Sequence, residues 1–169
     1  MANFKKCFVT VGTTRFDRLC NTIVKPEVII ALTKLGCEEV ICQIGNSDCD
    51  VGVFKKEGVN FTFYRFKNDI QQDIEEADLV ISHAGAGSCL ETLDNKKPLL
   101  VVINEDLMDN HQIELAERLH VDGHLYYCTC DTLENTLLVV DFALLFSLPK
   151  PDTGMFVKYL DDVLRVKNI

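Results

Sequence analysis

The residues with the clearest chemical character lie in the segment 78–92, where an apolar stretch ends in a glycine-rich turn. It reads Asp-Leu-Val-Ile-Ser-His-Ala-Gly-Ala-Gly-Ser-Cys-Leu-Glu-Thr, so a predicted strand passes through Gly85 and Gly87 into a predicted helix. The free N–H groups and the dipole at such a helix start favour an anion, typically phosphate, which glycines allow close to the backbone. Alternatively, the glycines only form a tight turn and Ser88 and Glu91 form a capping box. The two uses of Glu91 compete, because a side chain folded back onto the Ser88 amide cannot bind a ribose hydroxyl.

A second segment of this kind, 12–17, reads Gly-Thr-Thr-Arg-Phe-Asp and also joins a predicted strand to a predicted helix. The backbone amides of Gly12, Thr13 and Thr14 could hold a second phosphate. Alternatively, Thr14 or Asp17 merely caps the helix that follows.

The third segment, 104–112, crowds amide, carboxylate and imidazole groups just before a predicted helix and ends in Asn110, His111 and Gln112. Asn and Gln side chains both donate and accept hydrogen bonds, which suits the vicinal hydroxyls of a sugar. Alternatively, Asp109 or Asn110 caps the helix and the rest is a solvated loop.

Other known nucleotide motifs are absent from the pattern. The chain lacks the G-x-G-x-x-G fingerprint of dinucleotide-binding folds and the lysine of a Walker A loop. Asp48 and Asp50 have a spacing that can hold a divalent cation under a diphosphate, but they follow a strand where an acidic turn is common. We therefore expect no metal and no cofactor.

The elements that must position these segments are short apolar stretches alternating with longer helix-like stretches. Strands are predicted at 7–11, 39–44, 59–63, 79–82, 99–103 and 125–128, and helices at 17–35 (divided at Pro26), 70–77, 88–94, 111–119, 133–146 and 155–166. This alternation predicts an α/β fold with a doubly wound parallel sheet of about six strands, covered by helices on both faces. Ligands bind such sheets beyond the carboxyl ends of the strands, where the three segments fall.

Composition sets the class of protein. The chain has 169 residues, 47% of them hydrophobic, and a formal net charge of −9. We therefore expect one domain over 1–169, and no binding to nucleic acid or anionic lipid, which both need clustered basic residues. No secretory leader is expected, and the apolar stretch 137–148 is too short to span a bilayer and is predicted to be a buried helix. The eight cysteines mostly lie in apolar runs without a C-x-x-C pair, which predicts reduced core thiols and a reducing compartment.

Three motifs together carry a resemblance to a known family: residues 8–17 (Phe-Val-Thr-Val-Gly-Thr-Thr-Arg-Phe-Asp), the segment 78–92, and residues 97–112, which begin Lys-Pro-Leu-Leu-Val-Val-Ile-Asn and end Asn-His-Gln. They closely resemble the donor-binding subunits of eukaryotic UDP-N-acetylglucosamine transferases, which add the second GlcNAc to dolichyl-diphosphate-GlcNAc. The chain is more distantly similar to the C-terminal half of bacterial lipid II-forming GlcNAc transferases and other GT-B enzymes.

The resemblance implies one Rossmann-like half of a GT-B enzyme of glycosyltransferase family 28, active in inverting transfer without a bound metal. A membrane-anchored partner subunit would supply the acceptor face, the general base and recruitment of this cytoplasmic chain to the cytosolic face of the endoplasmic reticulum. The predicted helix within 153–169 would dock on that partner, or else on its own domain.

The resemblance also implies which residues hold the donor, UDP-GlcNAc: Gly12, Thr13, Thr14, His83, Gly85, Ala86, Gly87, Ser88, Glu91, Asn110, His111 and Gln112. Glu91 would take the ribose hydroxyls. His83 would lie near the diphosphate, where bacterial relatives have arginine, and a neutral imidazole would bring no charge. His111 is the candidate general base in this chain.

Two other hypotheses stay open at this point. The chain could be a non-catalytic module that binds a nucleotide sugar for regulation. It could also be a small nucleotide-dependent enzyme complete in one chain, such as a dehydrogenase, although the missing glycine fingerprint argues against this.

Overall fold

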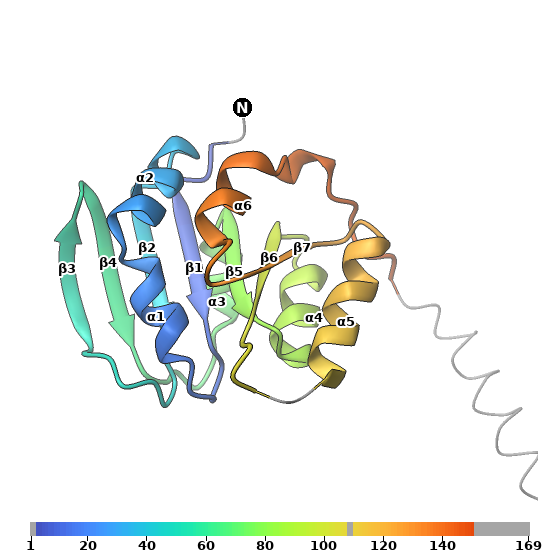
Figure 1. Cartoon of the computed structure of the whole chain (residues 1–169), viewed down its shortest axis with the longest axis horizontal. Helices are drawn as coiled ribbons and strands as arrows, with labels where there is room; N and C mark the ends of the chain where they lie inside the picture. The colour runs from blue at the N-terminus through green and yellow to red at the C-terminus, as the bar shows by residue number, and fades with distance from the viewer. Residues whose placement is uncertain (1–2, 108–109, 151–169) are drawn as a thin grey trace, which may run out of the picture.

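The computed structural model describes residues 3–107 and 110–150, except for the side chains of residues 110 and 111. A seven-stranded sheet lies at the centre of the described part (Figure 1), formed by β1 (Lys6–Thr10), β2 (Glu39–Gln43), β3 (Gly52–Lys56), β4 (Val59–Tyr64), β5 (Leu79–His83), β6 (Leu99–Ile103) and β7 (Tyr126–Thr129). The helices are α1 (Asp17–Ile23), α2 (Pro26–Lys34), α3 (Gln71–Glu76), α4 (Ala86–Asp94), α5 (Asn110–Val121), α6 (Leu133–Val139) and the short 3₁₀ turn η1 (Phe142–Leu144). The strand order is β3-β4-β2-β1-β5-β6-β7, which confirms a doubly wound α/β fold.

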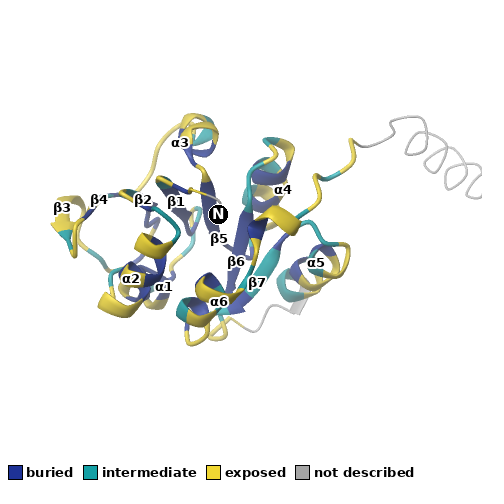
Figure 2. Cartoon of the chain, turned by 90° about the horizontal axis from the view of Figure 1, so that it is seen from above, coloured by how far each residue is buried: buried dark blue, intermediate teal, exposed yellow. Residues whose placement is uncertain are grey.

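Two hydrophobic layers enclose the sheet, because successive side chains of a buried strand point to opposite faces. Phe8 packs in the layer under α3, α4 and α5, whereas its neighbour Val9 packs in the layer under α1, α2 and α6. Figure 2 shows α3 and α4 on one side of the sheet and α1, α2 and α6 on the other. Every residue of β5 and β6 is buried, which confirms that their apolar runs are strands covered by helices on both faces.

The prediction of about six strands is corrected at one edge of the sheet, where β3 adds a seventh strand antiparallel to β4. Its five residues are exposed or half-buried and show no apolar run. A tight turn joins the two strands, with φ of +48° at Glu57 and +84° at Gly58, as a type I′ hairpin requires. Phe54 also stacks on its partner Phe61 with ring centroids 5.2 Å apart.

The predicted helix 133–146 is corrected as well, because α6 ends at Val139 and residue 140 is extended, with ψ of 144°. The side chain of Asp141 then caps η1, and this turn places Phe142 in the core. Its ring lies edge-on to Phe4 and Tyr126, with centroids 5.5 and 5.7 Å apart. The stretch 137–148 is therefore not a buried helix: residues 137–139 end α6, and residues 140–148 form a partly exposed segment that we call the strap. The division of the predicted helix 17–35 at Pro26 is confirmed by α1 and α2.

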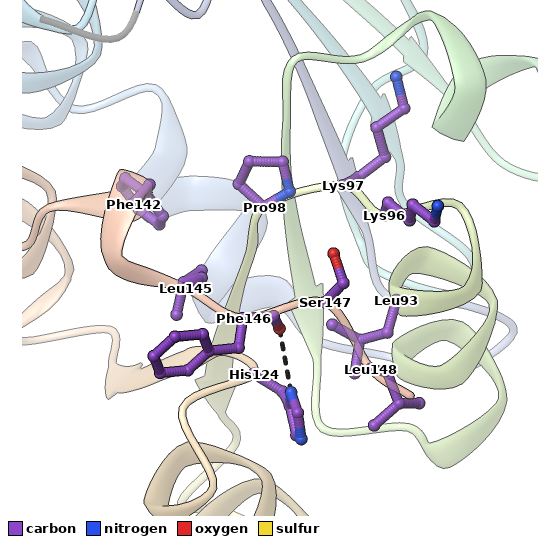
Figure 3. Close-up of a pocket in the computed structure, with 10 residues that line it drawn as sticks. All are labelled: Leu93, Lys96, Lys97, Pro98, His124, Phe142, Leu145, Phe146, Ser147 and Leu148. Carbon is purple, nitrogen blue, oxygen red and sulfur yellow. Dashed lines mark hydrogen bonds between the residues drawn. The ribbon is translucent and has the colours of Figure 1, made fainter. Parts of the chain in front are cut away.

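The strap is fixed after η1 by two hydrogen bonds to the turn that follows α5. The Phe146 amide donates to the Gly123 carbonyl at 2.9 Å. Nδ1 of His124 lies 3.0 Å from the Phe146 carbonyl oxygen (Figure 3). A cavity of about 70 Å³ remains beneath it, beside Pro98 at the amino end of β6. Cavities that hold small ligands are several times larger. This cavity also lies at the edge of the sheet opposite the carboxyl ends of the parallel strands, where ligands of this fold class bind. The predicted helix within 153–169 lies outside the described residues.

The cysteines agree with the prediction of core thiols. All eight are free, and every one except Cys49 is buried. Burial raises the pKa of Cys20, Cys89 and Cys128 to about 12, so these thiols stay protonated at neutral pH. Within the described ranges, no helix combines the length and apolar character needed to cross a bilayer.

Candidate functional site

A cleft of about 400 Å³ opens at the carboxyl edge of the sheet, the lower end in Figure 1. Six parallel strands of the described part end at this edge, and the cleft takes residues from the carboxyl ends of β1, β2, β4 and β5 and the segments that follow them. Its lining residues are Gly12, Thr13, Thr14, Gln43, Lys67, Asn68, Asp69, Ile70, His83, Gly85, Gly87, Ser88 and Glu91. The chain runs from β1 to β2 on one side of β1 and later crosses from β4 to β5 on the other side, which makes the edge between β1 and β5 a topological switch point.

The glycine-rich turn after β5 leads into α4, which begins at Ala86, two residues before the predicted start. Gly85 is the N-cap, so Ser88 is the third helical residue and cannot be the cap of a capping box. No side-chain hydrogen bond caps this helix. The Glu91 carboxylate has no partner among the described residues and lines the cleft. The competition for Glu91 is thereby decided in favour of a side chain that is available to a ligand.

The first turn of α4 offers unpaired backbone amides. The first amide of this helix with a backbone acceptor is that of Cys89, which donates to the Gly85 carbonyl at 3.0 Å. The amides of Ala86, Gly87 and Ser88 have no acceptor among the described residues, as expected at a helix start. Gly87 and Ser88 line the cleft, whereas Ala86 does not. An anion in the cleft would complete hydrogen bonds of these N–H groups at the positive end of the helix dipole.

The turn after β1 contributes less than its sequence suggests. Gly12 has φ of +61°, a left-handed conformation that favours glycine, and its amide donates to the Thr10 hydroxyl at 3.0 Å. The Thr14 amide and hydroxyl both donate to the Val11 carbonyl, at 3.2 and 2.7 Å. Of the three amides predicted to hold a second phosphate, that of Thr13 alone is left without an acceptor in the described structure.

The capping alternative for this turn is not observed. The N-cap of α1 is Phe16, without a side-chain cap, and its amide donates instead to the buried Ser47 hydroxyl at 2.9 Å. The Asp17 carboxylate accepts from the Asp48 amide at 2.7 Å. These bonds tie the turn after β1 to the loop after β2 and fix one wall of the cleft.

His83 fills the space between the two glycine turns. A Cβ atom on Gly85 would lie 2.3 Å from Nε2 of this ring, and one on Gly12 would lie 2.9 Å from Cε1. Nδ1 faces the Thr10 carbonyl oxygen at 3.4 Å, which places the proton of a neutral ring on Nδ1. Burial lowers the pKa of His83, against the smaller opposing effect of this hydrogen bond. The imidazole is therefore neutral at pH 7 and brings no charge to the cleft.

One wall of the cleft was missed by sequence reasoning. Gln43 ends β2, where its Oε1 accepts from the Thr10 hydroxyl at 2.6 Å, and residues 67–70 follow β4. The segment Lys-Asn-Asp-Ile has the composition of an ordinary solvated loop, so its residue types gave no warning. Its position at the carboxyl end of a parallel strand was the signal that could have found it.

The described residues of the third predicted segment, 104–112, do not line this cleft. Gln112 is half-buried on α5 and does not line the cleft, and the side chains of Asn110 and His111 lie outside the described residues. Asn104 borders a separate hollow of about 290 Å³. Asp48 and Asp50 border another hollow, which residues of α1, β3 and β4 also line. Within the described ranges, no three His, Cys, Asp or Glu residues are placed to hold a metal ion.

Comparison with known proteins gives consistent relatives. Residues 6–154 match the glycosyltransferase family 28 C-terminal domain. A protein of Homo sapiens named UDP-N-acetylglucosamine transferase subunit ALG13 is 54% identical over 129 residues, which are 76% of this chain and 11% of that protein. A Yarrowia lipolytica protein of the same name is 34% identical over 161 residues, 92% of this chain and 82% of that protein. The chain thus spans about a tenth of the length of the human relative and most of the fungal one.

Solved structures have the same architecture. An NMR structure of ALG13 superposes with a TM-score of 0.69 at 26% identity, covering 94% of this chain and 96% of that one. The crystal structure of Acinetobacter baumannii MurG superposes with a TM-score of 0.59 at 19% identity, covering 85% of this chain and 43% of that one. The second likeness shows that the fold occurs as about half of a longer chain.

Proposed function

The chain belongs to the family of glycosyltransferase family 28 C-terminal domains, and from this premise we propose that it is the donor-binding part of an inverting N-acetylglucosaminyltransferase. The donor is UDP-GlcNAc and the acceptor is dolichyl-diphosphate-GlcNAc. The observation that carries the proposal is the cleft itself, where the unpaired amides of α4, the Thr13 amide and the unpartnered Glu91 carboxylate face one space of about 400 Å³.

The donor fits this arrangement by the chemistry of its parts. The diphosphate accepts hydrogen bonds from the amides of Ala86, Gly87 and Ser88 at the positive end of the helix dipole. The Glu91 carboxylate, one helical turn further along the same face, accepts hydrogen bonds from the ribose hydroxyls. Gly87 has open space around it, with no atom within 4 Å of an added Cβ, so a phosphate can approach its backbone.

The transfer reaction places negative charge where these donors are. The O4 hydroxyl of the acceptor GlcNAc attacks the anomeric carbon of the donor, the bond to the diphosphate breaks with inversion to a β-1,4 linkage, and UDP departs. Charge develops on the departing phosphate oxygen, where fixed amides and a helix terminus stabilise the transition state. His83 stays neutral and acts here by filling the space between the two turns.

A second subunit completes the enzyme in this proposal. It is membrane-anchored, binds the lipid acceptor, supplies the general base and brings this chain to the cytosolic face of the endoplasmic reticulum. The support is that the curated relatives are named as subunits of a transferase. Among the described residues that line the cleft, Asp69 and Glu91 are the carboxylates and His83 is buried, and none of them is assigned as base.

The test compares Glu91→Gln with the matched control Asp94→Asn, an exposed acid at the end of the same helix. Donor binding is measured by saturation-transfer NMR, and transfer to the lipid acceptor is measured with the membrane subunit co-expressed. Glu91→Gln should weaken both donor binding and transfer, whereas Asp94→Asn should change neither.

The outcomes separate the proposal from its alternatives. Transfer that survives the loss of donor binding in Glu91→Gln would favour a non-catalytic module that binds a nucleotide sugar. Full transfer by the isolated chain would refute the requirement for a partner.

A further inference from the structure

The wall of the donor cleft formed by residues 67–70 is fixed at the end that leads into α3. The Asp69 carboxylate accepts from the Gln71 amide at 2.8 Å, where α3 begins. The Gln71 side chain then donates to Asn95, just past the end of α4, at 3.0 Å. Figure 2 shows α3 and α4 on the same face of the sheet. The wall is thereby held in a defined position relative to the helix that carries the amides.

Within this wall, the ammonium of Lys67 is held by a buried acid. Nζ donates to both carboxylate oxygens of Asp73 at 2.8 Å and lies 4.4 Å from the centroid of the Tyr64 ring. Tyr64 Oη donates to the same carboxylate at 2.6 Å. The Asp73 side chain is only 7% exposed, whereas that of Lys67 is 45% exposed. One N–H of the ammonium is left over, because a lysine has three donors and two are used.

The charges of the cleft give this lysine a role. Among the described residues that line the cleft, Lys67 is the one cation, Asp69 and Glu91 are acids, and His83 is neutral. A nucleoside diphosphate brings further negative charge. A cation that is already oriented loses little side-chain entropy when it binds an anion, which makes its contact stronger than that of a free surface lysine.

We propose that Lys67 contacts the phosphate groups of the bound nucleotide, and that Asp73 and Tyr64 are positioning residues that hold its ammonium at the cleft. The inference rests on the proposed function and extends it to a residue on the wall opposite α4. A merely structural role, in which the lysine only neutralises Asp73, is the competing explanation.

The experiment separates charge from structure with a paired substitution. Lys67→Met alone leaves a buried carboxylate without its cation, which can unfold the chain. The double variant Lys67→Met with Asp73→Asn removes both charges, keeps an acceptor for the Tyr64 hydroxyl and leaves the net charge unchanged. Lys67→Arg keeps the charge. The matched control is Lys97→Met, because Lys97 donates to the Glu75 carbonyl oxygen at the end of α3 and lines no part of the donor cleft.

The probes are uridine, UMP and UDP, titrated by NMR against the full chain with thermal unfolding recorded for each variant. The double variant should bind UDP on the order of tenfold more weakly, as expected for a lost charge-assisted hydrogen bond. Its affinity for uridine should stay within about twofold of the unsubstituted chain, because uridine carries no phosphate. Lys67→Arg and Lys97→Met should retain UDP binding.

Two results would overturn the inference while leaving the proposed function standing. Equal losses for uridine and UDP would show that Lys67 acts on the nucleoside or on the shape of the wall. Unchanged UDP affinity in a folded double variant would show that the pair is structural. If the unsubstituted chain binds none of the three probes, even with the membrane subunit present, the proposed function fails and takes this inference with it.

Discussion

Replacing Gly85 with alanine should lower the free energy of unfolding by about 1–3 kcal/mol, the usual range for overpacking a core. The added Cβ would lie 2.3 Å from Nε2 and 2.7 Å from Cε1 of His83. Ordinary contacts between such atoms are about 3.5 Å, so the ring must move by about 1 Å. It has little room, because His83 is 7% exposed and its other side already lies against Gly12. Such a shift would also break the contact of Nδ1 with the Thr10 carbonyl oxygen.

Gly87→Ala is the matched control, since an added Cβ there meets no atom within 4 Å. Gly87 is exposed in the first turn of α4, where alanine is the better helix former, so stability should be unchanged or raised by up to about 1 kcal/mol. Gly87→Ala should nevertheless bind UDP more weakly than the unsubstituted chain does, because its methyl group lies where the phosphate is proposed to approach.

The assay is urea unfolding followed by far-ultraviolet circular dichroism, because the chain has no tryptophan. Both variants should keep the slope of the unfolding free energy against urea, and only Gly85→Ala should lower the midpoint. A Gly85→Ala variant as stable as the unsubstituted chain would show that the imidazole does not occupy this space. Equal destabilisation by both variants would show that glycine is needed for its backbone and not for the ring.

Three further outcomes are expected. Burial lowers the pKa of His83, so the unfolded state binds the proton at a higher pH than the folded state does. The free energy of unfolding should therefore fall as the pH drops below about 6.5. In His83→Asn this fall should be smaller, as urea titrations at several pH values would show. Ser47→Ala leaves the buried Phe16 amide without its acceptor and should cost about 1–3 kcal/mol, seen as a lower urea midpoint at unchanged slope. Phe142→Ala empties a core site and should cost about 3–5 kcal/mol, whereas Phe146→Ala, 70% exposed, should fall within about 0.5 kcal/mol by thermal unfolding.

The parallel part of the sheet could be predicted from the sequence because its strands are buried on both faces. A strand such as Leu99–Ile103 must be apolar throughout, which leaves an unmistakable run. The edge strand β3 has the opposite character. Val53 is 78% exposed, and the strand forms through its hairpin turn and the Phe54–Phe61 stack, which a search for apolar runs does not detect. The end of α6 was missed for a related reason, since the apolar stretch continues beyond it into the strap.

The candidate site divides along similar lines. The segment around Gly85 could be found because a glycine-rich turn between a strand and a helix is typical of a helix start that binds anions. The wall 67–70 could not be found from residue types, because Lys67 acquires its place through Asp73 and Tyr64, and such pairings depend on three-dimensional structure. The capping box at Ser88 was a false alternative, since it depended on a helix start that the fold places two residues earlier.

Charge sets the physical problem that this cleft must solve. The chain carries a formal net charge of −9, so long-range electrostatics disfavour the approach of an anionic nucleotide. Affinity for the nucleotide must then come from groups that act within a few ångströms. Backbone amides act at this range, and unlike charged side chains they need no counter-ion when the cleft is empty. The amides of α4 can serve only if no side chain covers them, which is why an open Gly87 matters and why Glu91 must not fold back. In the proposed contact, Lys67 then adds one further donor to the phosphate, and Asp73 holds that donor in place through two hydrogen bonds.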